Sequence, residues 1–210
     1  MAALREFLLG FWAQALELWT NGGFCMPAIA AIGLLLFGLG IHLALGLRET
    51  GFAAIPEERW RRWIAVPGAR EGRIGELLDF VTGGQGLAQL TAAFGEVRAT
   101  ELAPFQRELR LMKVCIAAAP LLGLLGTVTG MLDTFQALAS GSGGDETMAM
   151  VSQGISAALI TTETGLVVAL PGVFFQFVLA RKFERYQVFL LHLETVCAQH
   201  LHRQAMRQAS

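Results

Sequence analysis

Three stretches of the chain are apolar enough and long enough to cross a lipid bilayer: residues 24–47, 111–138 and 148–180. At 1.5 Å per residue the first extends about 36 Å, which exceeds a hydrocarbon core of about 30 Å. The second and third are longer than the roughly 20 residues that a span needs, so we expect them to tilt or to project beyond the bilayer. Residues 139–147 are short and join these two spans as an antiparallel hairpin.

The segment 1–23 has apolar positions at helical spacing, with Arg5, Gln14 and Glu17 on the opposite side. The apolar positions are Leu4, Phe7, Leu8, Phe11, Trp12, Ala15, Leu16 and Trp19. This pattern predicts an amphipathic helix that lies in the membrane interface. Arg5 is the only basic residue in this segment, and Glu6 cancels its charge, so the segment does not resemble a cleavable signal peptide.

Two further segments, 48–110 and 181–210, are more polar but carry apolar residues at near-heptad spacing next to the second and third spans. These residues are Leu87, Leu90, Phe94, Val97, Leu102, Phe105, Leu109 and Met112, and Phe183, Tyr186, Leu190, Leu193, Cys197 and Leu201. The pattern predicts a helical insertion and a C-terminal helix that pack together as a bundle. The sequence RWRRW at 59–63 lies near a span, which favours contact with anionic lipid over nucleic-acid binding.

The composition agrees with an integral membrane protein. Of the 210 residues 54% are hydrophobic and 16% charged, and the mean hydropathy is +0.51. Soluble domains contain about 25% charged residues, so a water-facing globule is excluded. The net charge of -1 does not indicate nucleic-acid binding, and Cys25, Cys115 and Cys197 are too dispersed to indicate a metal site. We therefore predict an all-α membrane protein without a cofactor.

The basic residues predict the orientation of the three spans. Of sixteen Lys and Arg residues, nine lie in 48–110, Lys113 begins the second span, five follow the third, and only Arg5 remains. Basic residues accumulate on the cytoplasmic side of membrane proteins. Segments 48–110 and 181–210 are therefore predicted to be cytoplasmic, and the N-terminus and the loop 139–147 to lie outside.

Polar side chains within the second and third spans need a physical reason, because each is costly in hydrocarbon without a polar partner or water. Thr127 and Thr134 are seven residues apart and share a helix face, while Thr162 lies about 100° round the third span from Glu163. Any single threonine fits a role in helix packing. Glu163, however, lies near the middle of its span with no Lys or Arg at comparable depth, which favours a water-lined, proton-responsive zone.

Two other classes of protein also carry polar residues within their spans. A structural scaffold would use the same polar residues only to hold helices together. An intramembrane serine protease would need a histidine at the depth of its serine, and the only histidine in a span, His42, lies near one end. We therefore do not expect an enzyme.

The sequences PLLGLLGTVTGMLDTF (120–135) and GISAALITTETGLVVALPGVF (154–174) together resemble the MotA/TolQ/ExbB proton-channel family. The three-span layout, with an outside N-terminus and a cytoplasmic insertion after the first span, is similar to the ExbB/TolQ branch. The resemblance implies a homopentamer in the bacterial inner membrane, whose second and third helices line a central pore. The threonines of the family's pore motifs fall on Thr127 and Thr162.

The resemblance also implies partners. A dimer of a single-span ExbD/TolR-like protein would occupy the pore and carry the proton on a membrane aspartate, and force would pass to a TonB- or TolA-like protein. It leaves open which process is driven, TonB-type uptake, Tol-type envelope maintenance or another such as gliding or secretion. It also leaves open sodium in place of protons.

One position departs from the family. Many ExbB-like members carry glutamate where this chain has Ala157, and Glu163 is six residues later, turned about 120° away. Asp133 lies near the outer mouth, where polar residues are usual in the family, although a solvated helix end explains it nearly as well. The candidate pathway residues are thus Thr127, Asp133, Thr134, Ala157, Thr162 and Glu163.

Overall fold

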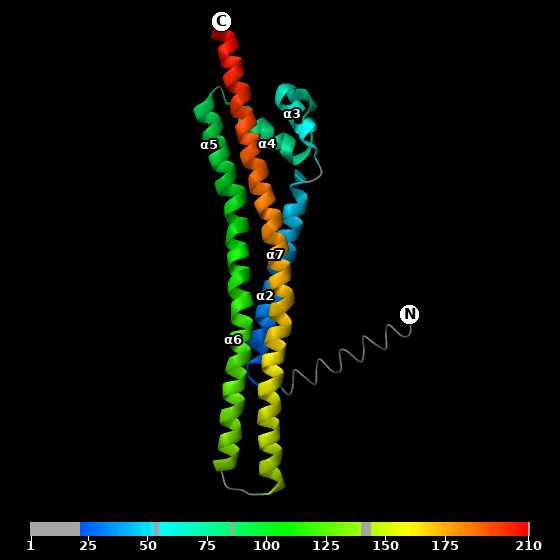
Figure 1. The fold of residues 1–210 in the computed structure, drawn as a ribbon, viewed down its shortest axis with the longest axis vertical. Helices are drawn as coiled ribbons and strands as arrows, with labels where there is room; N and C mark the ends of the chain where they lie inside the picture. The colour runs from blue at the N-terminus through cyan, green and yellow to red at the C-terminus, as the bar shows by residue number, and fades with distance from the viewer. Residues whose placement is uncertain (1–21, 53–54, 85, 140–143, 210) are drawn as a thin grey trace, which may run out of the picture. The chain divides into compact units, whose positions relative to one another are not determined.

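Long helices dominate the computed structural model, which describes residues 22–52, 55–84, 86–139 and 144–209 and contains no strand within them. The α-helices are α2 (Met26–Glu49), α3 (Glu57–Ala65), α4 (Gly72–Thr82), α5 (Leu87–Val97), α6 (Ala103–Ala139) and α7 (Asp145–Ala209) (Figure 1). The predicted interfacial helix falls on residues 1–23, of which 1–21 lie outside the described residues. Residues 140–143 of the loop 139–147 also lie outside them.

Three helical stretches are long and apolar enough to cross a membrane. They are Met26–Glu49, Leu87–Ala139 and Asp145–Arg203, with mean hydropathies of 2.3, 1.9 and 1.7 in their most apolar windows. The prediction of an all-helical protein with three candidate spans is confirmed. Pro120 and Pro171 lie inside α6 and α7 without ending them. Membrane helices tolerate proline where neighbouring groups satisfy the freed carbonyls.

A short π-helix, Arg98–Leu102, joins α5 to α6, so the helical chain continues from the polar insertion into the second span. π-turns insert an extra residue into a helix and commonly mark positions where the side-chain register must change.

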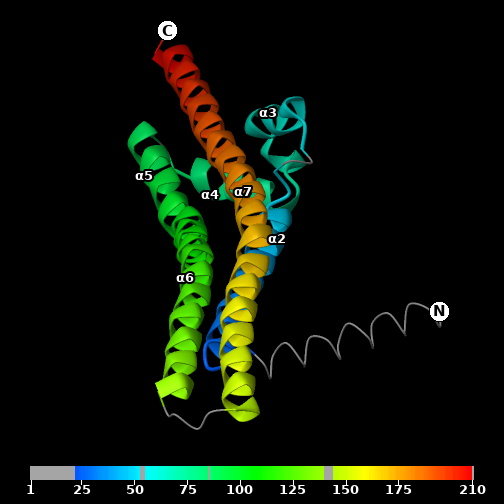
Figure 2. The same ribbon diagram turned by 60° about the horizontal axis from the view of Figure 1, so that its bottom comes forward.

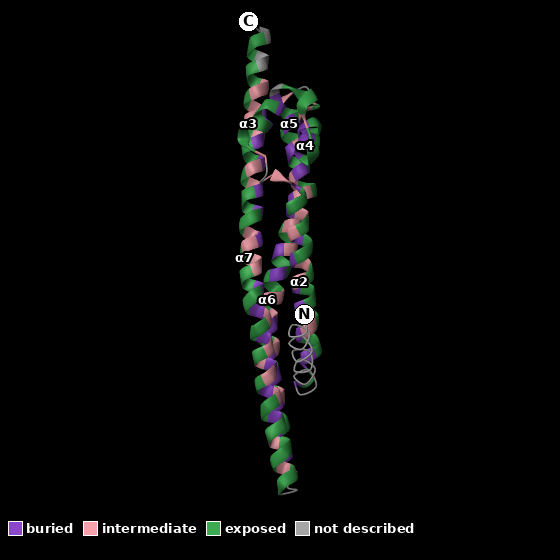
Figure 3. Ribbon diagram, turned by 90° about the vertical axis from the view of Figure 1, so that its right-hand side faces the viewer, coloured by how far each residue is buried: buried purple, intermediate pink, exposed green. Residues whose placement is uncertain are grey.

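The chain divides into two compact units. The first contains residues 22–38 and 111–175, and the second contains 39–110 and 176–209. In the first unit, α6 and α7 form an antiparallel pair (Figures 1 and 2). Only 22% of the most apolar window of each of these two spans is buried within the chain, and many large apolar side chains along them are exposed (Figure 3). Lipid or other subunits must therefore cover this surface.

The second unit has a conventional apolar core that follows the predicted heptad-like stripes. Its buried residues include Leu90, Phe94, Val97, Leu102, Leu109, Phe183, Tyr186, Leu190, Leu193 and Cys197. Of the other predicted stripe positions, Phe105 and Leu201 are only partly buried. Leu87 is 46% exposed, because it is the first residue of α5. The Phe105 ring contacts that of Phe183, with centroids 6.0 Å apart, and a Cβ built on Gly46 would lie 3.0 Å from the same Phe105 ring. Glycine there lets α2 approach α6 closely.

Arg70 connects the small helices α3 and α4. Its side chain is only 5% exposed. Its Nε donates to the Trp63 carbonyl at 2.9 Å, and its Nη1 donates to Asp79 Oδ1 at 2.6 Å and to Thr82 Oγ1 at 2.9 Å. A charge that is this buried needs such partners, so these bonds stabilise the packing of the polar insertion.

Candidate functional site

Glycines bring α6 and α7 into backbone contact within the first unit. A Cβ built on Gly130 would lie 2.6 Å from the Gly154 carbonyl oxygen, and one built on Gly165 would lie 2.7 Å from the Ala119 carbonyl oxygen. Such separations leave no room for a methyl group. Small residues at a membrane helix interface permit this approach, which strengthens dispersion contacts where no hydrophobic effect drives association.

Thr162 connects the two helices by a hydrogen bond. Its Oγ1 donates to the Gly123 carbonyl oxygen of α6 at 3.1 Å and lies 3.3 Å from the Ala158 carbonyl oxygen of its own helix. The side chain is only partly buried. It therefore lies at the rim of the interface.

Thr127 lies one turn from Gly123 along α6, about 6 Å away by helix rise. Its Oγ1 donates to the Leu124 carbonyl oxygen at 2.6 Å, and the side chain is also only partly buried. Its oxygen lone pairs remain available as acceptors.

Thr127 and Thr162 lie on the same edge of the helix pair. At 100° per residue, each is displaced about 60° from the centre of the buried face of its own helix, and antiparallel packing places both displacements on one side. The opposite edge is covered by α2. There, Val168 is 3.5 Å from a Cβ built on Gly33, and Leu36 is 2.6 Å from one built on Gly172. The edge with the two threonines is therefore the one that α2 leaves open.

Thr134 shares the face of Thr127, as its spacing predicts, but it has a different environment. It is 7% exposed, and its methyl group lies against Gly154 of α7. Because glycine has no side chain, the Thr134 methyl fills the gap, and its hydroxyl donates to the Met131 carbonyl oxygen at 2.6 Å. The structure thus places this candidate inside the helix interface.

The two carboxylates lie apart from the threonine edge. Glu163 is exposed on a stripe with Ser152 and Ser156, about 100° round α7 from Thr162 and further from α6. Asp133 is exposed about 120° round α6 from Thr127. Neither carboxylate forms an ion pair with another described residue.

Ala157 is partly buried, and its carbonyl oxygen accepts a hydrogen bond from Thr161 at 3.0 Å. Thr161 itself was not among the predicted site residues. It is 2% exposed and contacts Gly126, so it takes part in packing. The spacing of Gly123, Gly126 and Gly130 along one face was the sequence signal that could have indicated this contact.

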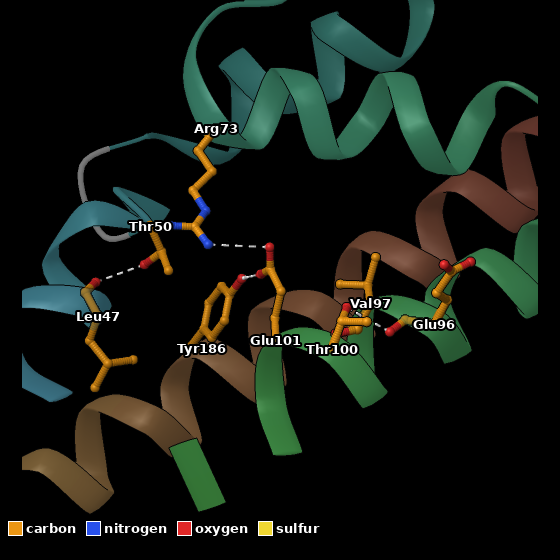
Figure 4. Close-up of polar contacts among 8 residues, drawn as sticks. All are labelled: Leu47, Thr50, Arg73, Glu96, Val97, Thr100, Glu101 and Tyr186. Carbon is orange, nitrogen blue, oxygen red and sulfur yellow. Dashed lines mark hydrogen bonds and ion pairs between the residues drawn. The ribbon is translucent and has the colours of Figure 1, made fainter. Parts of the chain in front are cut away.

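A polar network in the second unit connects three helices (Figure 4). Tyr186 of α7 donates to Glu101 Oε2 at 2.6 Å, and Arg73 of α4 lies 3.5 Å from Glu101 Oε1. Burial raises the pKa of Tyr186, and the hydrogen bond and charge of Glu101 raise it further. The network stabilises the packing of the polar insertion on α7. Among the described residues no cluster of His, Cys, Asp and Glu could hold a metal ion.

The three apolar helices and the polar, glycine-packed hairpin define a multi-span helical membrane protein. The family model for the MotA/TolQ/ExbB proton channel family matches residues 74–190. This chain therefore belongs to that family, in its ExbB/TolQ-like branch.

Individual relatives agree with this assignment. An ExbB homolog of Methanothermobacter thermautotrophicus is 30% identical over 178 residues, 78% of this chain and 62% of the relative. An ExbB-like protein of Synechocystis sp. is 49% identical over 71 residues, 33% of this chain and 28% of the relative. The Tol-Pal system protein TolQ of Haemophilus influenzae is 34% identical over 73 residues, 35% of this chain and 31% of the relative. The chain thus matches less than two thirds of the length of each.

Proposed function

We propose that this chain is the ExbB/TolQ-like subunit of an inner-membrane motor driven by the proton motive force. The observation that carries the proposal is the shared edge of Thr127 and Thr162, the edge that α2 leaves uncovered. Family membership and relatives named for biopolymer transport and the Tol-Pal system support it. In this proposal five copies form a ring, and the threonine edges line its lumen.

The threonines act by orientation and solvation. A threonine hydroxyl does not release its proton near neutral pH, but it can both donate and accept hydrogen bonds. Thr127 and Thr162 donate to backbone carbonyls at 2.6 Å and 3.1 Å. Their lone pairs can accept from lumen water or from a protonated carboxyl. The proton itself binds to and leaves a carboxylate of an ExbD/TolR-like partner. The threonine oxygens accept a hydrogen bond from that group when it is protonated, and from the lumen water that solvates it when it is ionised.

Glu163 has a second role in the proposal. It is exposed on the single chain and has no cationic partner among the described residues, so in the ring it contacts lumen water. This position does not reproduce the glutamate that Ala157 replaces, because the two side chains lie about 120° apart on α7. Asp133 lies near the outer end, where water solvates it, and Thr134 contributes packing.

In this proposal the C-terminus and the insertion 48–110 are cytoplasmic and the N-terminus is periplasmic, which the distribution of basic residues supports. Movement of the ring relative to the partner dimer would pass force to a TonB- or TolA-like protein. A neighbouring gene for a small single-span protein with a membrane aspartate would identify that partner. Whether the sequence of that partner is ExbD-like or TolR-like would distinguish a TonB-type from a Tol-type process.

The alternative is a structural scaffold, favoured by the packing roles of Thr134 and Thr161. The test compares Thr127→Val and Thr162→Val with Thr164→Val. Thr164 is also a partly buried threonine, and it donates to the Ile160 carbonyl oxygen at 2.7 Å, about 160° round α7 from Thr162. Cells that express the chain with its genomic single-span partner are assayed for proton entry.

We expect proton entry to fall roughly five- to thirtyfold in Thr127→Val and Thr162→Val, because each loses a lumen hydrogen bond worth about 1–2 kcal/mol. Thr164→Val should keep wild-type entry, and all three variants should assemble normally. Wild-type entry in both pore variants would support the scaffold and reject the motor.

A further inference from the structure

A cavity of about 600 Å³ opens in the second unit, between the C-terminal end of α2 and the part of α7 that follows its apolar stretch. These two helix segments lie side by side in both views of the ribbon (Figures 1 and 2). The volume lies within the range of roughly 300–1,000 Å³ that is typical of small-molecule sites. No candidate pathway residue lines the cavity.

One wall of this cavity is apolar and the other is cationic. The apolar wall includes Leu45, Leu47 and Phe52, and Ala44 contributes only a methyl group. The cationic wall consists of Arg48 from α2 and Lys182 and Arg185 from α7, and no acidic residue is among the residues that line the cavity. Three positive charges therefore converge beside a hydrocarbon surface.

These cations have no carboxylate partner. Arg48, Lys182 and Arg185 are exposed, and none forms an ion pair with another residue in the described part of the chain. Other arginines of the same unit are paired, Arg70 with Asp79, Arg73 with Glu101 and Arg98 with Glu194. Glu184 lies in a separate, smaller depression with Arg181 and Arg185. Like charges that line one cavity repel one another unless an anion lies between them.

The positions of the three cations along α2 and α7 indicate how deep the cavity lies in the membrane. Arg48 follows the apolar stretch of α2, and Lys182 and Arg185 follow that of α7. Cations at the end of a membrane span lie at the level of the lipid headgroups, and their aliphatic stems extend along apolar surface. A free phosphate would satisfy the cations but leave the apolar wall exposed, whereas a phospholipid covers both.

We propose that this cavity binds an anionic phospholipid of the cytoplasmic leaflet. Its phosphate lies among Arg48, Lys182 and Arg185, and an acyl chain lies along Ala44, Leu45 and Phe52. Basic pockets between membrane helices bind anionic headgroups in this manner. The proposal goes beyond the motor function and does not depend on it, since it concerns a different part of the chain and a different ligand.

The test uses the full-length chain purified in detergent, with bound lipid measured by native mass spectrometry. Phosphatidylglycerol and phosphatidylcholine are titrated separately, and inorganic phosphate is added as a competitor. The cavity variant is Arg48→Gln/Lys182→Gln/Arg185→Gln. The matched control, Arg107→Gln/Arg110→Gln/Arg203→Gln, removes the same charge from exposed arginines outside the cavity. A second variant, Ala44→Phe, fills the apolar end and keeps every charge.

We expect the wild type and the control to retain phosphatidylglycerol more strongly than phosphatidylcholine, and inorganic phosphate not to displace the bound phosphatidylglycerol. The cavity variant should bind it roughly a hundredfold more weakly, since each of the three cations removed is worth about fivefold in affinity for an anionic lipid. Ala44→Phe should also weaken binding. Equal binding by the cavity variant and the control would overturn the proposal. So would displacement by phosphate, equal retention of phosphatidylcholine, or unaltered binding by Ala44→Phe.

Discussion

The hydroxyl of Thr162 on α7 donates a hydrogen bond to the carbonyl oxygen of Gly123 on α6, over a distance of 3.1 Å. This bond joins the two helices at the edge of their interface and places Thr162 one helical turn from the level of Thr127. Because Gly123 has no side chain, the threonine can reach the backbone of the other helix. The same contact therefore holds the hairpin together and positions a hydroxyl at its open edge.

Removing this bond should have a small effect on stability. Hydrogen bonds between membrane helices contribute about 0.6 kcal/mol on average. Thr162→Val should therefore lower the free energy of unfolding of the purified chain by about that amount, as measured by denaturant titration of its helicity. A loss of several kcal/mol would mean that Thr162 acts mainly in packing, and the fall in proton entry could then be a folding defect.

The glycines of the hairpin should be far less tolerant of substitution than other helical glycines. Gly130→Ala places a methyl group 2.6 Å from the Gly154 carbonyl oxygen and 2.9 Å from the Ala158 methyl, so the helices must separate. We expect a loss of about 1–3 kcal/mol in the free energy of unfolding, the usual cost of overpacking. Gly38→Ala is the control, since nothing lies within 4 Å of a Cβ there. It should be neutral or stabilise by up to about 1 kcal/mol. Equal effects of both substitutions would contradict the close packing.

Tyr186 should titrate at unusually high pH. It is the only tyrosine in the chain, so tyrosinate absorbance reports this residue alone. Burial and Glu101 raise its pKa, and ionisation should begin well above the ordinary value of about 10. A raised pKa stabilises the folded protein fully below the ordinary value, and this contribution is lost as the pH rises above it. Glu101→Gln should lower the pKa of Tyr186 towards the ordinary value, and an unchanged titration would show that the Glu101 contact does not form.

Arg70 should be indispensable for the packing of α3 and α4. Arg70→Lys keeps the charge but cannot reproduce three hydrogen bonds to Trp63, Asp79 and Thr82. We expect the free energy that holds this region folded to fall by about 1–3 kcal/mol. The readout is faster protease cleavage within residues 55–84. Arg59→Lys is the matched control, because Arg59 is exposed, and it should change stability by less than about 0.5 kcal/mol. Identical cleavage of the two variants would contradict this role.

Hydrophobic spacing was sufficient to predict the three long helices and the core of the second unit, as the buried Leu90 and Phe94 illustrate. Such positions repeat with the helical period, and burial follows directly from that period. The environment of Thr134 could not be predicted in this way. Thr127 and Thr134 occupy nearly the same angular position, and only the register of α7, which sets Gly154 opposite Thr134, separates a partly exposed threonine from a buried one.

The separation of Asp133 and Glu163 from the threonine edge has a similar cause. The helical period places each residue at a known angle, but it does not show which face of α6 meets α7. That face is determined by contacts between residues far apart in the sequence, such as Gly126 with Thr161. The glycine spacing along α6 is the part of this information that a single sequence carries.

The most direct test of the central claim measures whether the edge that carries Thr127 and Thr162 lines a water-filled lumen. The native cysteines Cys25, Cys115 and Cys197 are replaced by alanine, and Thr127→Cys, Thr162→Cys and Thr164→Cys are then introduced singly into the assembled chain in liposomes. A membrane-impermeant, water-soluble thiol reagent should modify the first two at least tenfold faster than the third. Equal modification of all three, or faster modification of Thr164→Cys, would contradict a lumen at this edge.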